Sequence, residues 1–281
     1  MLPVAATIPE VRTAVAAARA QGHTVGFVPT MGALHAGHAA LVRAAKRATG
    51  FVVVSVFVNP TQFGPHEDFA KYPRTLDADR QLSADAGADL VFAPPVEVMY
   101  PPGATTFVDM AGLTEVLEGP SRPGHFRGVC TVVLKLLNLV GPDVAVFGAK
   151  DAQQARVVRK MVRDLDVPVT IQVEPTVREP DGLAMSSRNR YLSPVERTVA
   201  PRIHQALQAA RSRALAGEID AARLQSALHA ELGAIPGARV DYAAVVDDET
   251  LKPLARLDRP ALVAVAVYLG TTRLIDNVTI P

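Results

Sequence analysis

The chain has 281 residues, of which 49% are hydrophobic, and its 29 basic and 28 acidic residues leave it nearly neutral. A chain of this length can bury a full hydrophobic core and can divide into two domains. The near-neutral charge provides no broad basic surface, so we expect no nucleic-acid partner. No apolar run approaches the roughly 20 residues that a membrane helix needs, so we expect no membrane partner.

The amino terminus and the cysteine content indicate a cytoplasmic protein. The first residues include the acidic Glu10 and continue into an amphipathic pattern, which is unlike a secretory signal peptide. Cys130 is the single cysteine, so the chain cannot form an internal disulfide.

Short β-branched runs alternate with helical patterns in the first half of the chain. We expect strands at 23–29, 51–59, 89–95, 143–148 and 169–175, and helices at about 37–48, 76–85, 128–140 and 151–165. Thr75 is the expected N-cap of the helix at 76–85, and Gly87 is its expected C-terminal stop. Continuous apolar strands alternating with helices indicate a parallel sheet covered on both faces. We therefore expect an α/β, Rossmann-like domain over residues 1–176.

Polar segments follow three of these strands. They are PTMGALHAGH at 29–38, NPTQFGP at 59–65 and GAKDAQQ at 148–154. Ligands of open parallel sheets bind at the carboxyl ends of the strands, at a switch point in the strand order. We therefore expect the three loops to converge on one edge of the sheet.

After about Thr176 the pattern becomes that of a small α+β domain. The SPVE sequence at 193–196 is a capping box with proline at the first helical position, and we expect one long helix from there to about Gly217. A further helix is expected at 221–232 and strands at 239–247, 261–269 and 272–280, the last two joined at 270–272. The DDET sequence at 247–250 is expected to form a turn. We expect residues 177–281 to form a smaller α+β C-terminal lid domain.

The turn after the first strand carries two histidines in the pattern HxGH. Glycines at a strand–turn–helix junction let backbone N–H groups approach phosphate oxygens, and a helix N-terminus favours negative charge. His35 and His38 lie near one face of the first helical turn, where imidazoles can donate hydrogen bonds to developing phosphate charge. Gly37 leaves space for a base or ribose. The alternative to a phosphate site is that the two histidines simply start a helix and bind no ligand. A zinc site is disfavoured because the pair has no third ligand nearby: His66 and His125 lie in other loops.

Two further segments suit a phosphate ligand. In DGLAMSSRNRYLS, Ser186 and Ser187 can hydrogen-bond phosphate and Arg188 can hold it bidentately, although the segment also fits an interdomain linker. In FGAKDAQQ, Lys150 lies just past a strand end, where a cation can neutralise a triphosphate. Asp151 can cap the next helix or bind a ribose hydroxyl. An ordinary helix start with an exposed lysine is the alternative for this second segment.

An HxGH turn followed by an MSSR loop on an α/β pattern resembles the signature of the nucleotidyltransferase superfamily, which includes class I aminoacyl-tRNA synthetases. More specifically, the chain resembles the pantothenate synthetase (pantoate–β-alanine ligase) family. The matching stretches are PTMGALHAGH, VFVNPTQF, YPRT, RPGHFRGVCTVVLKL, DAQQ, TVREPDGLAMSSRNRYL and LGTTRLIDN, and they span nearly the whole chain. One departure is Ala149, which stands where the family usually has glutamate in Gly-Glu-Lys-Asp and bears on local loop structure.

The resemblance implies an ATP-dependent condensation of pantoate with β-alanine to pantothenate. It implies a pantoyl-adenylate intermediate, release of AMP and pyrophosphate, Mg2+, and a homodimer. A carboxylate is already a competent nucleophile at neutral pH, so the protein's task is positioning and charge neutralisation. The residues assigned to that task are His35, His38, Lys150, Ser186, Ser187 and Arg188, with His38 as the family's proton donor.

The same resemblance implies a set of substrate contacts. The nucleotide site is expected to contain Met31, Gly32, Ala33, Leu34, His35, Ala36, Gly37, His38, Gly148, Ala149, Lys150, Asp151, Val177, Met185, Ser186, Ser187 and Arg188. Backbone groups of Val177 and Met185 are expected to read the adenine edge. The resemblance places Gln62 and Gln154 on pantoate, and Gln62 also near β-alanine; each side-chain amide offers both a donor and an acceptor. Met31 is an apolar wall for the gem-dimethyl group of pantoate.

The basic residues at 122–127 and Asp79 have two interpretations each, and Cys130 has one. Arg122, His125 and Arg127 are a basic cluster for phosphate or the β-alanine carboxylate, or else a solvated loop. Asp79 is a tentative magnesium ligand, with an exposed helix acid as the preferred alternative. Cys130 falls on a buried helix pattern and is expected to be inert packing.

Three competing functions remain open. A nucleotidyltransferase that moves AMP onto a phosphorylated acceptor would use the same HxGH turn, but would not need the two glutamines. A class I tRNA ligase needs a basic anticodon-binding module, for which the region after Thr176 is too short and too neutral. A catalytically silent nucleotide-binding regulator is disfavoured by the intact histidines, lysine and serine–arginine loop.

Overall fold

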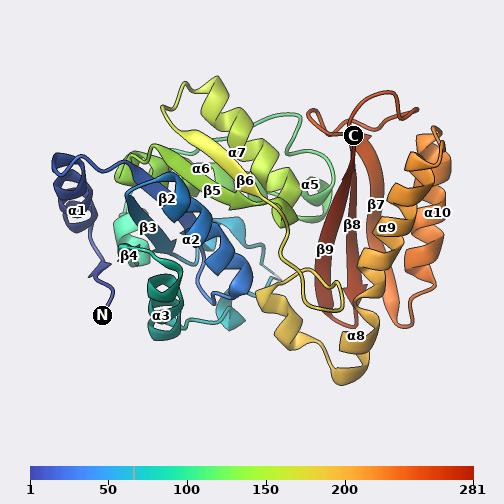
Figure 1. Cartoon of the computed structure of the whole chain (residues 1–281), viewed down its shortest axis with the longest axis horizontal. Coiled ribbons are helices and arrows are strands. Elements are labelled where there is room, and N and C mark those ends of the chain that lie inside the picture. The colour runs from blue at the N-terminus through green and yellow to red at the C-terminus, as the bar shows by residue number, and fades with distance from the viewer. Residues whose placement is uncertain (66) are drawn as a thin grey trace. The chain divides into compact units, whose positions relative to one another are not determined.

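The computed structural model describes residues 1–65 and 67–281, and the chain forms two compact units (Figure 1). The first unit comprises Met1–Thr114, Ser121–Ala149 and Gln154–Pro175. The second comprises Glu115–Pro120, Lys150–Gln153 and Thr176–Pro281. Two short stretches from before Thr176 thus belong with the C-terminal unit.

A six-stranded parallel sheet organises the first unit. Its strands are β1 (Val4–Ala5), β2 (Val25–Thr30), β3 (Phe51–Val56), β4 (Leu90–Phe92), β5 (Val144–Gly148) and β6 (Thr170–Glu174). Their order is β1-β4-β3-β2-β5-β6. The α/β prediction is confirmed, although the strand expected at 51–59 ends at Val56 because the next residues turn into the loop of a short 3-10 helix.

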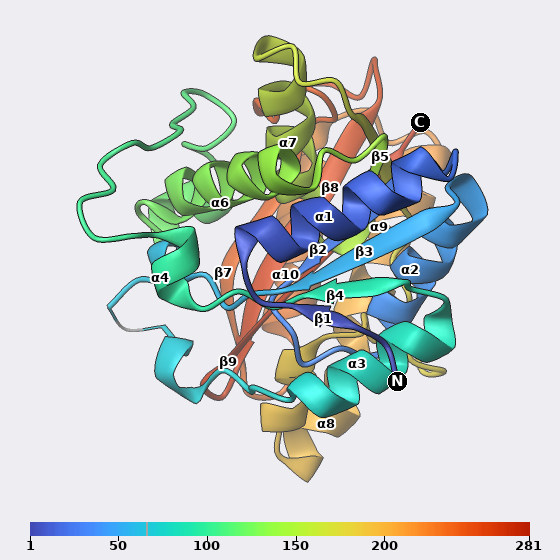
Figure 2. The same ribbon diagram turned by 90° about the vertical axis from the view of Figure 1, so that its left-hand side faces the viewer.

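Helices cover the sheet of the first unit on both faces, as Figure 2 shows: α1 and α6 pack against each other, and α2 packs against α3. The helices along residues 1–175 are α1 (Ile8–Ala20), α2 (Ala36–Ala48), α3 (Leu76–Ala86), α4 (Val96–Met99), α5 (Glu118–Ser121), α6 (His125–Val140) and α7 (Ala152–Asp164). Most of α5 and the start of α7 belong to the second unit. Short 3-10 helices occur at η1 (Pro60–Gln62), η2 (Phe69–Lys71) and η3 (Ala149–Asp151). A core of valines and alanines, including Val28, Val42 and Val54, joins α2 to the strands. No helix among the described residues is long and apolar enough to cross a membrane.

Helix α6 is buried along most of its length, as its apolar sequence predicts. Cys130 lies within it and is fully buried. Burial raises the pKa of its thiol to about 11, and the charge of Asp109 adds to the effect. Cys130 is therefore a packing residue with little thiolate character.

The strand order reverses between β2 and β5. From β2 the chain runs outward to β3 and β4, and it then returns through α6 to place β5 on the other side of β2. The first residues of β5 pair with Gly26 and Phe27 of β2. A reversal of this kind separates the loops that leave the two strands and creates the usual ligand site of such sheets. The HxGH turn follows β2, and Gly148 and Ala149 lie at the end of β5.

The second unit contains a three-stranded antiparallel sheet in the order β7-β8-β9. Its strands are β7 (Ala238–Asp247), β8 (Ala261–Leu269) and β9 (Thr272–Ile280), and its helices are α8 (Pro194–Val199), α9 (Arg202–Leu215) and α10 (Ala221–Gly233), with a 3-10 helix η4 (Ser187–Tyr191). Helices α9 and α10 pack on each other and on the sheet (Figure 1). Their leucines and alanines, among them Leu207 and Leu228, share one core with alternate residues of β8 and β9. The smaller α+β fold expected for this region is confirmed.

The expectation of one long helix from SPVE to Gly217 is wrong. The capping box forms between Ser193 and Glu196, but it opens the six-residue helix α8, and the chain then begins α9 at Arg202. Pro201 lies at the break. Proline has no N–H to donate to the preceding turn, which interrupts the helical hydrogen-bond ladder. By contrast, the DDET turn is present: the carboxylate of Asp247 accepts hydrogen bonds from the N–H groups of Glu249 and Thr250.

Candidate functional site

The HxGH turn begins helix α2 with its own histidines. His35 is the N-cap, and its Nδ1 accepts a hydrogen bond from the N–H of Gly37 at 3.1 Å. The Nδ1 of His38 accepts one from the N–H of His35 at 3.3 Å, and the two ring centroids are 4.2 Å apart. An imidazole nitrogen that accepts a hydrogen bond carries no proton, so the proton of each neutral ring is on Nε2. In this arrangement the Nε2–H of each ring is a hydrogen-bond donor, the kind of group that a phosphate oxygen accepts from.

The carboxylate of Asp79 braces the same turn. Asp79 lies on α3, is 1% exposed, and accepts hydrogen bonds from the N–H groups of Ala33 at 3.1 Å and Leu34 at 2.7 Å. Thr75 Oγ1 also donates to it at 3.3 Å. The braced backbone is unusual, because Gly32 and the non-glycine Ala33 both have positive φ, 84° and 51°. Asp79 therefore holds the turn in a conformation that the chain does not adopt by default.

The interpretation of Asp79 as an exposed helix acid is wrong. Helical spacing cannot reveal that a loop from 45 residues earlier folds over the carboxylate and uses both of its oxygens. Those oxygens already accept backbone N–H groups, so the side chain does not have the open oxygens of a magnesium ligand.

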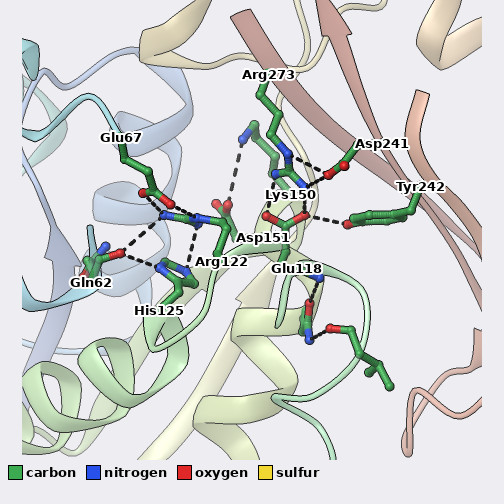
Figure 3. Close-up of polar contacts among 12 residues, drawn as sticks. Gln62, Glu67, Glu118, Arg122, His125, Lys150, Asp151, Asp241, Tyr242 and Arg273 are labelled. Atoms are coloured by element: carbon green, nitrogen blue, oxygen red, sulfur yellow. Dashed lines mark hydrogen bonds and ion pairs between the residues drawn. The ribbon is translucent and has the colours of Figure 1, made fainter. Parts of the chain in front are cut away.

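Gln62 lies on η1, after β3, and its backbone carbonyl faces Arg122 and His125 (Figure 3). Its Nε2 is 3.2 Å from Met31 Sδ, and its Oε1 accepts from Asn59 Nδ2 at 3.0 Å. His125 Nδ1 donates to its backbone carbonyl at 2.9 Å. Gly128 of α6 permits this packing, because a Cβ there would lie 2.4 Å from the carbonyl oxygen of Thr61. Gln62 is only 8% exposed, and these contacts fix the orientation of its amide.

The three basic residues near the start of α6 do not act as one cluster. Arg122 forms a bidentate ion pair with Glu67, at 2.8 and 2.7 Å, and its Nη1 lies 3.0 Å from His125 Nε2 (Figure 3). Arg127 instead stacks over the ring of Phe107, with 4.2 Å from its guanidinium carbon to the ring centroid. Arg122 and His125 thus support the loop of Gln62, a role that neither interpretation from the sequence predicted.

Gln154 lies in the first turn of α7, which follows β5. The strand of Gln62, β3, is separated from β5 only by β2 in the sheet. Because all three strands are parallel, Gln62, Gln154 and the HxGH turn follow neighbouring carboxyl ends of one sheet. The three loops were expected to converge on one edge of the sheet. The structure confirms that the strands they follow end next to one another at that edge.

Lys150 and its neighbours belong to the second unit. The carbonyl of Lys150 accepts a hydrogen bond from Asn277 Nδ2 on β9 at 3.0 Å. Its ammonium is 3.9 Å from the carboxylate of Asp151, which Figure 3 shows, and its side chain is 21% exposed. A surface ion pair of that length contributes little energy, so the ammonium is available to an anionic ligand at small cost.

A buried ionic cluster lies beside the Lys150 segment in the second unit (Figure 3). Arg273 of β9 forms a bidentate pair with Glu118, at 2.6 and 2.9 Å, and also binds Asp241. Tyr242 donates to Glu118 at 2.8 Å; burial and that carboxylate raise the pKa of Tyr242. Burial lowers the pKa of Arg273, but the two carboxylates outweigh this effect and raise it overall. Both raised pKa values mean that Arg273 keeps its charge and Tyr242 keeps its proton near neutral pH.

The MSSR segment is ordered by its own backbone. Ser186 is the N-cap of η4, and its hydroxyl oxygen accepts from the N–H of Arg188 at 3.2 Å. The N–H of Met185 donates to the carbonyl of Val177 at 3.0 Å. This bond joins the two residues whose backbone groups the sequence analysis expects at the adenine edge, and it uses the N–H of Met185 and the carbonyl of Val177. The serine hydroxyl, while capping, still has its own proton to donate.

Metal-ligating side chains do not gather in the part of the chain that the structure describes: no group of three His, Cys, Asp or Glu residues comes together there. His66, which enters the argument against zinc, lies outside the described residues.

Comparison with known proteins identifies the family. The family model for pantoate–β-alanine ligase matches residues 3–279. The chain belongs to the pantoate–β-alanine ligase family. It is 57% identical over 274 residues to the pantothenate synthetase of Moorella thermoacetica, covering 98% of this chain and 97% of that protein.

Solved structures of this ligase family have the same fold. The crystal structure of pantothenate synthetase from Thermus thermophilus superposes with a TM-score of 0.93 at 51% identity, covering 99% of each chain. The pantoate–β-alanine ligase of Francisella tularensis, solved in complex with β-γ ATP and β-alanine, has a TM-score of 0.80 at 34% identity, covering 99% of this chain and 97% of that one. The chain is therefore an amide-forming ligase by family, and the Rossmann-like α/β prediction is confirmed.

Proposed function

We propose that the chain condenses pantoate with β-alanine to pantothenate, at the expense of ATP cleaved to AMP and pyrophosphate. The observation that carries this proposal is the match of the ligase family model to residues 3–279, which includes every motif described above. The Francisella tularensis ligase, solved with β-γ ATP and β-alanine, supports ATP and β-alanine as the small-molecule substrates.

In the first step, a carboxylate oxygen of pantoate attacks the α-phosphorus of ATP, and the bond to the β-phosphate breaks to release pyrophosphate. The Nε2–H groups of His35 and His38 donate to the triphosphate, with His38 as proton donor to the leaving pyrophosphate. Lys150 neutralises charge, and Ser186, Ser187 and Arg188 bind phosphate oxygens. The bracing of the HxGH turn by Asp79 supports this role, because fixed donors need no reorganisation during the reaction.

In the second step, the neutral amine of β-alanine attacks the acyl carbon of pantoyl adenylate. The amide C–N bond forms, the acyl C–O bond to AMP breaks, and the nitrogen loses a proton to solvent. Gln62 and Gln154 bind the carboxylate and hydroxyls of pantoate, and Met31 packs against its gem-dimethyl group. The contact of Gln62 Nε2 with Met31 supports this pairing, since it brings the polar and apolar contacts for pantoate together. The remaining nucleotide contacts are Gly32–Gly37, Gly148, Ala149, Asp151, Val177 and Met185.

Magnesium enters this proposal as the ion of MgATP. The described residues do not supply a carboxylate cage, and Mg2+ commonly keeps its waters and binds substrate phosphates instead. We further propose that the enzyme is a cytoplasmic homodimer. Light scattering of the purified protein tests the dimer, and chelation followed by readdition of Mg2+ tests the ion.

The decisive experiment is release of AMP from ATP in the presence of pantoate and β-alanine, with each substrate omitted in turn. Pantoate-dependent exchange of pyrophosphate into ATP without β-alanine would establish the adenylate step. Exchange that requires a phosphorylated acceptor would favour a nucleotidyltransferase. Absence of turnover under all conditions would favour a silent nucleotide-binding protein.

A further inference from the structure

Strand β9 of the second unit contacts both segments that the proposed function assigns to phosphate. The first is Lys150, whose carbonyl accepts from Asn277 Nδ2 at 3.0 Å. The second is the segment leading to Ser186, which begins at Thr176 and is joined to β9 through Arg178. Both contacts come from consecutive residues, Asp276 and Asn277.

Asn277 and Arg273 hold the Lys150 stretch from one face of β9. They are four residues apart in a strand, so their side chains project to the same face. Arg273 binds Glu118, whose N–H donates to Gln153 Oε1 at 3.0 Å; Gln153 Nε2 in turn donates to the carbonyl of Val116 at 2.7 Å. The stretch Lys150–Gln153 is thus attached to the second unit at both ends, by Asn277 at the lysine and by Glu118 at the glutamine (Figure 3 shows the cluster at Glu118).

Asp276 holds the other segment from the opposite face of the strand. Its carboxylate is 5% exposed and forms a bidentate pair with Arg178, at 2.7 and 2.9 Å. The same guanidinium donates to the carbonyl of Gly182 at 3.1 Å. Arg178 therefore closes the turn between Arg178 and Ala184, which pair as an isolated antiparallel bridge directly before Met185 and Ser186.

We propose that Asp276 and Asn277 are positioning residues for adenylate formation. Asn277 holds Lys150 in place by donating a hydrogen bond to the backbone carbonyl of Lys150. Asp276 holds the Ser186–Arg188 segment in place through its ion pair with Arg178. The two residues set the spacing between the ammonium and the hydroxyl–guanidinium groups, because one strand holds both. This inference rests on the proposed function, in which Lys150 and Ser186–Arg188 bind the triphosphate.

The test for Asn277 is a double-mutant cycle with Lys150, measured as single-turnover formation of pantoyl adenylate with enzyme in excess. Asn277→Ala is expected to slow this step about tenfold or more, the scale of a small misplacement at a reacting centre. In a Lys150→Ala background the same change is expected to have no further effect, because there is no ammonium left to position. Multiplicative losses in the double mutant, or a wild-type rate for Asn277→Ala, would overturn the proposal.

Two further variants separate positioning from folding. Asn277→Asp keeps the shape of the side chain but places an oxygen against the carbonyl of Lys150, so it is expected to reproduce the loss of rate even if the alanine variant does not fold. Gln225→Ala removes another hydrogen bond between a side-chain amide and the backbone in the same unit, although in the opposite direction: the N–H of Val245 donates to Gln225 Oε1 at 3.2 Å. It is expected to keep the wild-type rate; an equal loss in this control would show a general effect of destabilisation.

For Asp276 the variant is Arg178→Lys, which keeps the charge but loses the bidentate fork. It is expected to slow adenylate formation and to raise the KM for ATP, with no effect on the KM for β-alanine. In an Arg188→Ala background, Arg178→Lys is expected to cause no further loss of rate; additive effects would contradict the assignment.

If the wild-type protein forms no adenylate, the proposed function fails. If the wild type is active and both cycles are additive, the positioning role alone fails.

Discussion

The carboxylate of Asp79 accepts a hydrogen bond from the backbone N–H of Leu34 at 2.7 Å. Asp79 belongs to α3, which begins 41 residues after His35, and this bond fixes the turn that presents the His35 side chain. We predict that Asp79→Asn destabilises the protein by about 2 kcal/mol, because one of two backbone N–H groups then faces an amide NH2. The rate of adenylate formation is expected to fall and the KM for ATP to rise. Thermal unfolding and pyrophosphate exchange measure the two effects.

A matched control for that change lies at the other end of the sheet. Asp89 accepts the N–H of Val52 and the ammonium of Lys46, both at 2.8 Å. Asp89→Asn is expected to reduce stability and to leave the KM for ATP unchanged. If both variants change the KM equally, Asp79 has no particular connection with the nucleotide.

His38 has two roles: it caps the start of α2, and it is the proposed proton donor. A substitution can remove the second role and keep the first. His38→Gln retains a residue that suits the N3 position of a capping box, so we expect stability to be nearly unchanged. The rate of adenylate formation is expected to fall more than about a hundredfold, the scale for losing a donor to the transition state. Denaturant unfolding and pyrophosphate exchange, measured on the same preparation, check this pair of outcomes. Near wild-type exchange would remove His38 from its role.

Gln62 is expected to determine pantoate affinity. Gln62→Ala should raise the KM for pantoate about tenfold, since a side-chain hydrogen bond contributes roughly 1 kcal/mol and its loss leaves a buried substrate group unpaired. Its neighbour Asn59 keeps a contact with the carbonyl of Gly128, at 3.2 Å, so the loop should persist. Gln81→Ala, on the exposed side of α3, is the control. Equal changes in the KM values for pantoate and ATP would contradict the assignment.

His204 is expected to make the stability of the protein depend on pH. Burial lowers its pKa, the positive charge of Arg178 lowers it further, and Asp276 partly opposes both effects. The unfolded chain therefore binds the proton more tightly, and the free energy of unfolding should fall as the pH drops below the ordinary histidine pKa of about 6.5. The loss should level off below the lowered pKa of the folded state. Urea unfolding between about pH 5 and pH 7.5 measures it, and His204→Gln should flatten this part of the profile.

The elements that the sequence predicted correctly are those with strong local signals. Helix α3 ends at Gly87, as expected, because a residue with φ of 98° favours glycine. Strands β2 and β5 were recognisable because buried parallel strands have continuous apolar runs. The break at Pro201 was missed because the capping box before it and the apolar pattern after it were read as one helix. Proline itself was the available signal.

The supporting residues of the site could not be predicted by the same means. Asp79, Asn277 and the pair of Arg178 with Asp276 act across long separations in the sequence, which local periodicity does not register. Gly128 resembles any helical glycine until the close approach of Thr61 is seen. The residues proposed to touch substrate came from motifs, and those that hold them came from tertiary structure.

The burial of Cys130 has a practical consequence. A fully buried thiol with a pKa near 11 is almost entirely protonated at neutral pH and reacts slowly with maleimides and other alkylating reagents. Cys130 is the single cysteine of the chain, so the wild-type protein has no reactive thiol that would compete for a label attached to an introduced cysteine. A second cysteine introduced at the exposed Tyr191 could carry a fluorophore or spin label, and the spectroscopic signal would report on that position alone.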